Sequence, residues 1–171
     1  MGMKIVVATL FLSWSLCSCL PQTRTNQLVP VVRSSTQTGQ AVLVTTKGGN
    51  DESIRKGLGV TSGDFKDALE ISLVDSGLFK EIADGGYQLE TRILNIRNPG
   101  ESAVFEVITE IEVSYTLRRA ESVVWEKTIR SSHRTESGEA LLGEFRDRIS
   151  TEGAIRENIK IAISAMSERL R

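Results

Sequence analysis

A long stretch of alternating polar and apolar residues constrains the fold of this chain more than any other feature. It spans residues 103–119, AVFEVITEIEVSYTLRR. Successive side chains of a strand point to opposite faces, so the stretch predicts one strand with a dry side and a wet side. The dry side carries Phe105, Val107, Ile111, Val113, Tyr115 and Leu117. The wet side carries Glu106, Glu110, Glu112, Ser114, Thr116 and Arg118.

Two further segments alternate in the same way. YQLETRIL, residues 87–94, places Tyr87, Leu89 and Ile93 on one side. VVWEKTIRSSHR, residues 123–134, alternates two sets of side chains: Val123, Trp125 and Ile129 against Glu126, Thr128 and Arg130. Residues 98–100 and 119–122 have the composition of turns. Strands of this kind joined by turns predict an antiparallel sheet with one buried face and one wet face.

Two segments have helical spacing instead. Residues 64–76 place five small or apolar side chains on one side of a helix: Phe65, Ala68, Leu69, Ser72 and Leu73. Thr61 or Ser62 can cap this helix, and Gly77 supplies its C-terminal stop. Residues 151–170 predict a second helix, with its apolar stripe on Ile155, Ile159, Ala162, Ile163, Met166 and Leu170.

Two short apolar runs complete the expected order. Residues 41–46 and 78–83 each predict a strand, so the elements follow one another as β-α-β-β-β-β-α. Each helix must bury its apolar stripe, and the dry face of the sheet is available to both. We therefore predict an α+β fold, a two-layer sandwich. It has a mostly antiparallel sheet of four to five strands, two helices packed on one face, and the polar face open.

The N-terminus predicts export. Residues 1–18 contain one cation, Lys4, then the apolar run IVVATLFLSW and small residues, as in a secretory signal peptide. The apolar run is about half the length that a membrane-spanning helix needs. Leu16-Cys17-Ser18-Cys19 resembles the lipobox of bacterial lipoproteins. That resemblance implies that Cys19 is lipidated with diacylglycerol and an N-acyl chain.

Other interpretations of the two cysteines are weaker. A disulfide between Cys17 and Cys19 would close a strained small ring, and a metal site would need more ligands nearby. An uncleaved hydrophobic anchor is a further alternative. We expect a signal peptide over residues 1–18, the lipidated Cys19 and a flexible tether over 19–40, and the domain over 41–171. LVPVVR, within the tether, could add an edge strand.

The chemistry that this sequence predicts is sparse. A net charge of -1, from 21 basic and 22 acidic residues, argues against nucleic acid as a partner. The single histidine, His133, has no nucleophile or acid placed by spacing to form a triad, and neither GxSxG nor a phosphate loop occurs. Metal-ligand spacing is missing as well. We therefore expect no enzyme activity, no metal and no cofactor.

The wet face of the sheet is the expected binding surface. Its candidate residues are Glu106, Glu110, Glu112, Arg118 and Arg130. An exposed edge strand, which could add to the sheet of another protein, is the other surface to consider.

The layout resembles a family of small outer-membrane lipoproteins, the YajG type. FKDALEISLVDSGLF would match its first helix and next strand, YQLETRIL the following strand, and EGAIRENIKIAISAMSERL its C-terminal helix. LptE, which plugs a β-barrel partner, is a more distant likeness. The resemblance, with Leu20 rather than Asp after the lipidated residue, implies a lipid anchor in the outer membrane and a domain in the periplasm.

These features predict a non-enzymatic, membrane-anchored lipoprotein whose domain binds or scaffolds a component of the cell envelope, with an envelope protein as the expected partner. One alternative is a module that binds lipopolysaccharide or peptidoglycan. An envelope enzyme is the least favoured alternative.

Overall fold

The computed structural model of the chain describes residues 25–48, 60–98, 106–136, 138 and 143–171. Its strands are β1 (Ala41–Gly48), β2 (Glu81–Ile82), β3 (Tyr87–Arg97), β4 (Glu106–Arg119) and β5 (Ser122–Glu136). Its helices are α1 (Thr25–Leu28), α3 (Ser62–Asp75) and α4 (Gly143–Arg169). The predicted order β-α-β-β-β-β-α is confirmed, and a short helix precedes it.

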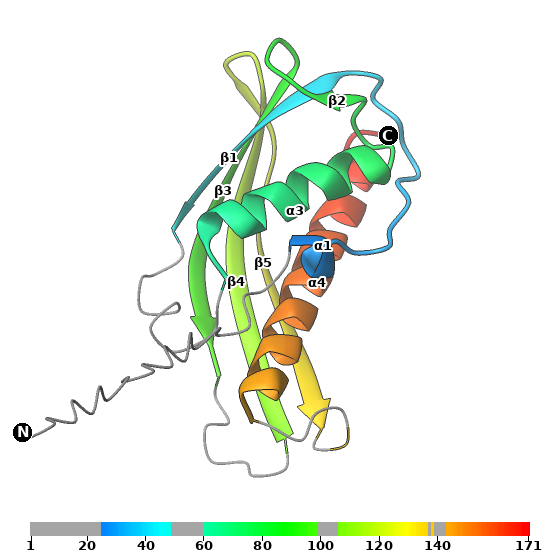
Figure 1. The fold of residues 1–171 in the computed structure, drawn as a ribbon. Coiled ribbons are helices and arrows are strands. Elements are labelled where there is room, and N and C mark those ends of the chain that lie inside the picture. Colours follow the sequence, from blue (N-terminus) through cyan, green and yellow to red (C-terminus); the bar gives the residue numbers. More distant parts are fainter. Residues whose placement is uncertain (1–24, 49–59, 99–105, 137, 139–142) are drawn as a thin grey trace, which may run out of the picture.

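The five strands form one open sheet in the order β2-β1-β3-β4-β5 (Figure 1). β3, β4 and β5 are antiparallel in turn, whereas β1 runs parallel to both of its neighbours. The connection from β2 to β3 therefore passes around β1. Gly86 makes this possible, because a Cβ at this position would lie 2.3 Å from the backbone oxygen of Ala41.

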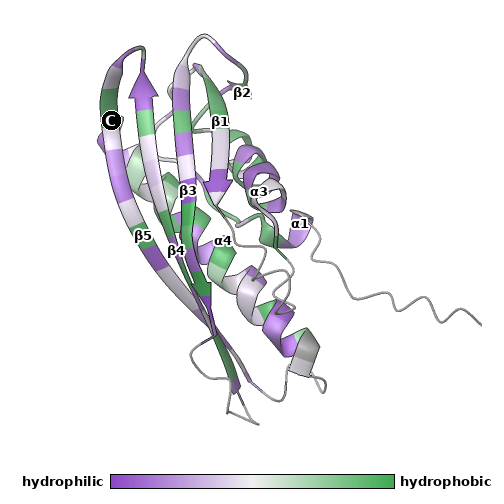
Figure 2. Ribbon diagram, turned by 90° about the vertical axis from the view of Figure 1, so that its left-hand side faces the viewer, coloured by the Kyte–Doolittle hydropathy of each residue, from purple (hydrophilic) through white to green (hydrophobic). Residues whose placement is uncertain are grey.

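Two long helices cover one face of the sheet, as Figure 2 shows from the side. α3 packs against β1, and α4 packs against β4 and β5. The buried side chains of α3 are the five that the sequence predicted. Thr61 caps α3 in a capping box with Asp64, and Gly77 follows the helix with φ +76°. The α+β two-layer sandwich is thus confirmed.

α4 is longer than predicted. It begins at Gly143, eight positions before the expected start at residue 151. Its central and C-terminal turns carry the predicted stripe, in which Ile155, Ile159, Ala162, Ile163 and Met166 are fully buried. Its first turns lack such a stripe, which explains why apolar periodicity did not reveal them.

Two strand predictions need correction. The segment 78–83 contributes only the short strand β2, while Leu78 and Phe79 are buried just before it. Val123, expected in the core, is 48% exposed. A bulge between Leu117 and Arg118 pairs Arg118 with Val123, so Val123 lies on the polar face. Phe105, also expected in the core, lies outside the described residues.

Residues 25–40 form a strap over the helices, whereas the sequence predicted a flexible tether for 19–40. α1 contacts both α3 and α4, and Leu28 is fully buried. Val29 and Val32 pack against the core, and no strand forms within the strap. A polar composition did not prevent this docking, because a few apolar side chains suffice when a groove between two helices receives them.

Candidate functional site

The open face of the sheet carries three ion pairs that join neighbouring strands. Each pair has its glutamate on β4. The Arg97 Nη2 lies 2.6 Å from Glu110 Oε2, and the Arg130 Nε lies 2.9 Å from Glu112 Oε1. Both of these pairs are directly opposite in the strand register. The third pair is diagonal and joins Glu106 Oε2 to Arg134 Nη1 at 3.2 Å.

A hollow of about 560 Å³ lies among these side chains. This volume falls within the range of about 300–1,000 Å³ that is typical of small-ligand sites. The hollow crosses β3, β4 and β5 and is lined by Asn95, Arg97, Glu110, Ile111, Glu112, Arg130, Ser131 and Ser132.

The structure brings together three of the five predicted site residues. Glu110, Glu112 and Arg130 line the hollow. Glu106 lies on the same face and pairs with Arg134 farther along β4. Arg118 lies opposite Val123 near the other end of β4. It is six positions from Glu112, or about 20 Å along the strand, so it is not part of the hollow.

Sequence reasoning missed the contribution of β3 to the hollow. Asn95 and Arg97 reach it because a bulge between Ile93 and Asn95 shifts the register. Strict alternation from Ile93 would have assigned both residues to the buried face. Ser132, opposite Glu110, was also missed, although alternation from Arg130 places it on the same face.

The charges of the hollow compensate one another. Two guanidinium groups and two carboxylates lie on the same patch, in a partly exposed setting. Exposed ion pairs contribute about 0–1 kcal/mol each to stability, so these pairs add little to the fold. Guanidinium groups donate hydrogen bonds in a planar fork, and carboxylates only accept them. The hollow is therefore suited to a polar ligand that offers both donors and acceptors.

A buried hydrogen-bond network connects the sheet to α4 behind the hollow. The Tyr115 hydroxyl donates to Asn158 Oδ1 at 2.7 Å. The Asn158 amide donates to the carbonyl of Ile129 at 3.0 Å and to Ser131 Oγ at 3.1 Å. Burial raises the pKa of the Tyr115 phenol, which keeps its proton available for this bond. The network holds the strands behind the hollow in register with the helix.

Glu152 of α4 has a buried carboxyl group within the helical layer. It is 5% exposed, and its Oε1 lies 3.6 Å from Arg148 Nε. Burial raises the pKa of Glu152, while the positive charges of Arg148 and Arg156 act in the opposite direction. A raised carboxyl pKa is typical of acid catalysts. Glu152, however, lies on α4, not in the hollow, and its charged neighbours belong to its own helix.

His133 lies on the helical side of the sheet, over α4. A Cβ added at Gly153 would lie 2.2 Å from its Cδ2 atom. His133 is therefore in contact with the helix and does not line the hollow. Within the described residues, no group of three or more His, Cys, Asp or Glu side chains could hold a metal ion.

The contact between His133 and Gly153 gives a testable prediction. We expect Gly153→Ala to lower the free energy of unfolding by about 1–2 kcal/mol, since overpacking moves the imidazole. In a His133→Ala background the same substitution should raise stability by up to about 1 kcal/mol, because alanine favours a helix over glycine. Urea denaturation of the four variants measures both effects. The same sign of effect in both backgrounds would contradict the contact.

Solved bacterial proteins share this fold at low sequence identity. A Xanthomonas campestris protein of the family DUF330 matches with a TM-score of 0.63 and 14% identity, covering 82% of this chain and 94% of its own. A candidate lipoprotein from Caulobacter crescentus matches with a TM-score of 0.53 and 12% identity, covering 75% of this chain and 89% of its own. A minor lipoprotein from Acinetobacter baumannii matches with a TM-score of 0.51 and 9% identity, covering 77% of this chain and 94% of its own. Likeness at such identities establishes the fold alone.

No family model and no curated protein matches the sequence. None of the helices in the described part of the chain is long and apolar enough to cross a membrane. Cys19 and the predicted signal peptide lie outside the described residues.

Proposed function

We propose that the protein is a non-enzymatic lipoprotein of the cell envelope, anchored through lipid on Cys19, whose domain binds an envelope component at the hollow of the open sheet face. The observation that carries the binding role is the cross-strand set of charges around this hollow. Arg97 with Glu110, and Arg130 with Glu112, add little to stability, yet the sheet presents them together on a face that the helices leave open.

The anchoring part of the proposal is supported by the Leu16-Cys17-Ser18-Cys19 motif after an apolar run. Two proteins with the same fold are also named as lipoproteins, one of them as a candidate. The outer membrane is the proposed location, from the resemblance to YajG-type proteins and from Leu20, because Asp at that position commonly retains lipoproteins at the inner membrane. Two or three acyl chains would hold the domain at a membrane without a spanning helix.

An envelope protein is the proposed partner. Charged groups arranged in complementary pairs give a protein interface its specificity and its register. The neighbouring Glu106–Arg134 pair extends the charged surface beyond the hollow, which suits a partner larger than one small molecule.

Peptidoglycan is the second candidate ligand. The hollow offers guanidinium and carboxylate groups side by side, and peptide stems of peptidoglycan carry both carboxylate and amino groups. The volume of about 560 Å³ would hold a short segment of such a stem.

The anchor is tested by labelling cells with radioactive palmitate. We expect Cys19→Ala to abolish incorporation of the label, because the thiol that accepts diacylglycerol is lost. Cys17→Ala is the matched control and should leave labelling intact, since this residue would be removed with the signal peptide. Label that persists in Cys19→Ala would overturn the anchoring proposal.

The binding role is tested by crosslinking in cells from a photoreactive residue at Ser132, which lines the hollow. We expect one envelope protein to be captured, and we expect Arg130→Glu to reduce capture at least about tenfold, equivalent to 1.4 kcal/mol. Arg118→Glu is the control for charge on the same face outside the hollow, and it should change capture less than about twofold.

A charge swap separates folding from recognition. Arg130→Glu combined with Glu112→Arg keeps the ion pair but exchanges its ends, so the fold should persist while capture stays low. Equal loss of capture in Arg118→Glu and Arg130→Glu would contradict the hollow as the site. Retention of the domain on purified peptidoglycan, with no protein captured, would favour the second candidate.

A further inference from the structure

The strap over residues 25–40 determines where the membrane anchor leaves the domain. α1 contacts both long helices, and Figure 2 shows it on the side of the helices away from the sheet. The guanidinium of Arg156 donates to the carbonyl of Gln27. Arg156 is the central residue of α4, which runs over Gly143–Arg169, so the chain reaches the helical layer at the middle of this helix.

The rest of the strap is bonded to the C-terminal ends of both helices. Ser35 N and Ser34 Oγ donate to Ser167 Oγ at 3.1 and 2.8 Å, and Ser167 is 2% exposed. Ser34 N also donates to the carbonyl of Ser76 at 2.9 Å. The guanidinium of Arg171 donates a further hydrogen bond of 2.9 Å to Ser35 Oγ. These bonds, with the buried Leu28, hold the strap against the domain along its length.

The distance from the anchor to the strap is short. Thr25 follows Cys19 by six positions, and six residues span at most about 20 Å when fully extended. A helix with its side chains is about 10 Å across, and packed layers lie about 10 Å apart. A path from Thr25 to the open sheet face would cross these two distances in depth. It would also run about 10 Å sideways, from above the middle of the five-stranded sheet to its edge. The path is therefore longer than the available chain.

We propose that the strap orients the domain on the membrane, with the layer of α3 and α4 toward the lipid surface and the polar sheet face turned away from it. This inference rests on the proposed lipidation of Cys19. In this orientation the hollow around Arg130 and Glu112 faces the aqueous compartment, where a partner can reach it.

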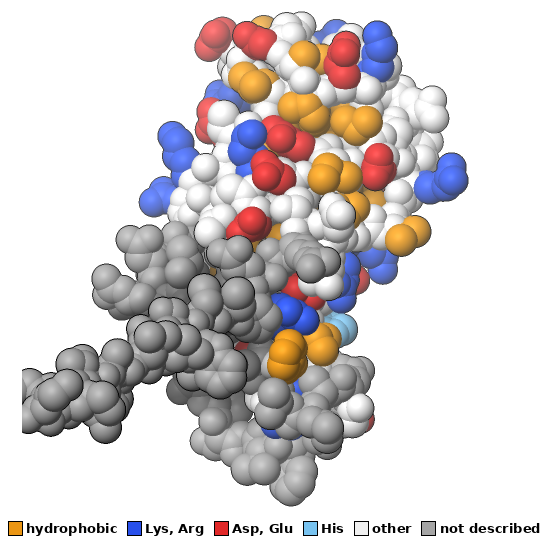
Figure 3. Space-filling view, in the orientation of Figure 1, with side chains coloured by type: hydrophobic (Ala, Val, Ile, Leu, Met, Phe, Trp, Pro, Cys, Tyr) orange, Lys and Arg blue, Asp and Glu red, His pale blue; other side chains and the backbone are white. Residues whose placement is uncertain are grey.

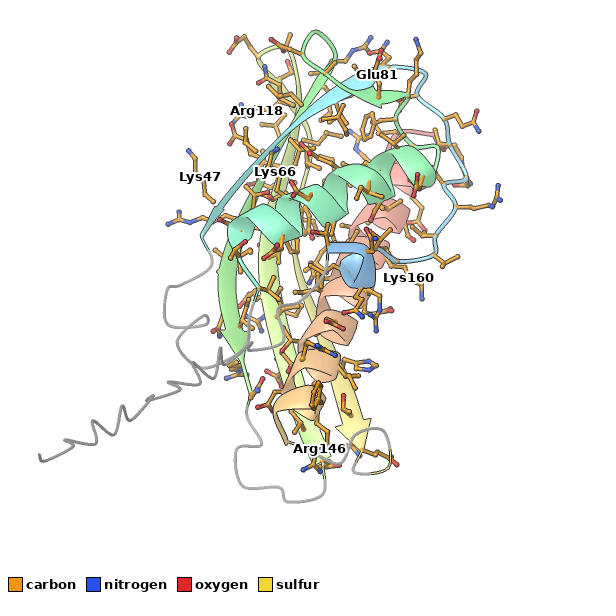
Figure 4. All side chains as sticks on the ribbon, viewed as in Figure 1. Lys47, Lys66, Glu81, Arg118, Arg146 and Lys160 are labelled. Atoms are coloured by element: carbon orange, nitrogen blue, oxygen red, sulfur yellow. The ribbon has the colours of Figure 1, made fainter. Side chains whose placement is uncertain are left out.

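The surface of the helical layer suits contact with a membrane of uncharged lipids, with the lipid anchor holding the domain in place. Val31 of the strap is 100% exposed and Ile71 of α3 is 38% exposed on this side. Lys66 and Lys160, labelled in Figure 4, pair with Glu70 and Glu157 of their own helices. In the space-filling view of Figure 3, apolar side chains alternate with charges of both signs. A surface with charges of both signs gains little binding free energy from electrostatic attraction to anionic lipids.

Energy transfer in vesicles tests the orientation with the mature lipidated protein, which begins at Cys19. The vesicles consist of phosphatidylcholine and phosphatidylethanolamine with an acceptor dye on a fraction of the headgroups. A donor dye is attached to one introduced cysteine, either Lys160→Cys on α4 or Thr128→Cys on the open face of β5. These thiols would be the only free ones, since the sequence has two cysteines, one lost with the signal and one lipidated. We expect at least twofold greater transfer from position 160.

A linker variant tests the role of the short reach without disturbing the fold. Twenty Gly and Ser residues inserted between positions 24 and 25 would add a coil with a root-mean-square length of about 25 Å. We expect the difference between positions 160 and 128 to fall below about 1.3-fold in this variant. An unchanged difference would overturn the role of the strap.

The outcomes separate this inference from the proposed function. Vesicle-bound protein with equal transfer from both positions, or greater transfer from position 128, would overturn the orientation and leave the anchor intact. Failure of the protein to remain on the vesicles would overturn the anchor, and the orientation with it.

Discussion

Replacing Leu28 by aspartate is expected to lower the free energy of unfolding by about 4 kcal/mol or more. Leu28 is fully buried where α1 meets α3 and α4. Truncation of such a side chain to alanine costs about 2–5 kcal/mol, and a carboxylate in the same place adds an uncompensated charge. Since native domains have about 5–15 kcal/mol of stability, this loss removes a large share of the total, and the urea midpoint should fall accordingly.

Val31→Asp is the matched control for this effect. Val31 lies three positions further along the same strap, but it is 100% exposed. Its substitution should change stability by less than about 0.5 kcal/mol. Urea denaturation followed by circular dichroism compares the two variants in the same background. A cost below about 1 kcal/mol for Leu28→Asp would mean that the strap is not docked and behaves as the flexible tether predicted from composition.

Replacing Asn158 by alanine is expected to lower stability by about 3 kcal/mol. The Asn158 amide satisfies the Tyr115 hydroxyl, the Ile129 carbonyl and Ser131 Oγ, all within the buried layer. Each buried polar group that loses its partner costs about 1–3 kcal/mol. Tyr115 loses its acceptor, and Ile129 loses a donor. A smaller loss, about 1–2 kcal/mol, is expected for Tyr115→Phe, because only one bond is removed.

Glu157→Ala provides the control for position 158. The two residues are adjacent on α4, but the side chain of Glu157 is 46% exposed and its ion pair with Lys160 is at the surface. Such a pair contributes about 0–1 kcal/mol. The comparison uses denaturant midpoints and slopes. If Glu157→Ala and Asn158→Ala lower the free energy of unfolding equally, the buried network does not connect the sheet to the helix.

The parts of the fold that follow from local pattern were predicted from the sequence. α3 was found because its apolar spacing, a capping residue at Thr61 or Ser62, and the terminating Gly77 lie within one short segment. The face of β4 was found because polar and apolar residues alternate without interruption over residues 110–118. In both cases the information is contained in neighbouring residues.

The hollow was predicted only in part, because it depends on register. Glu110, Glu112 and Arg130 follow from alternation along their own strands. Arg97 joins them only because the bulge near Asn95 turns the end of β3. A bulge depends on how two strands pair, and pairing partners far apart in the chain leave little signal in either segment.

The amino-acid order alone was sufficient to identify which strand face is wet, which helix side is apolar, and which cysteine matches a lipidation motif, because each is a property of a few adjacent residues. Packing between distant segments was needed to dock Leu28 between α3 and α4, to form the ion pairs of Arg97 and Arg130, and to place Asn158 beside Tyr115. Side chains more than forty positions apart meet in the last case. The energy of such contacts exists only once the layers are assembled, and so no local pattern records it.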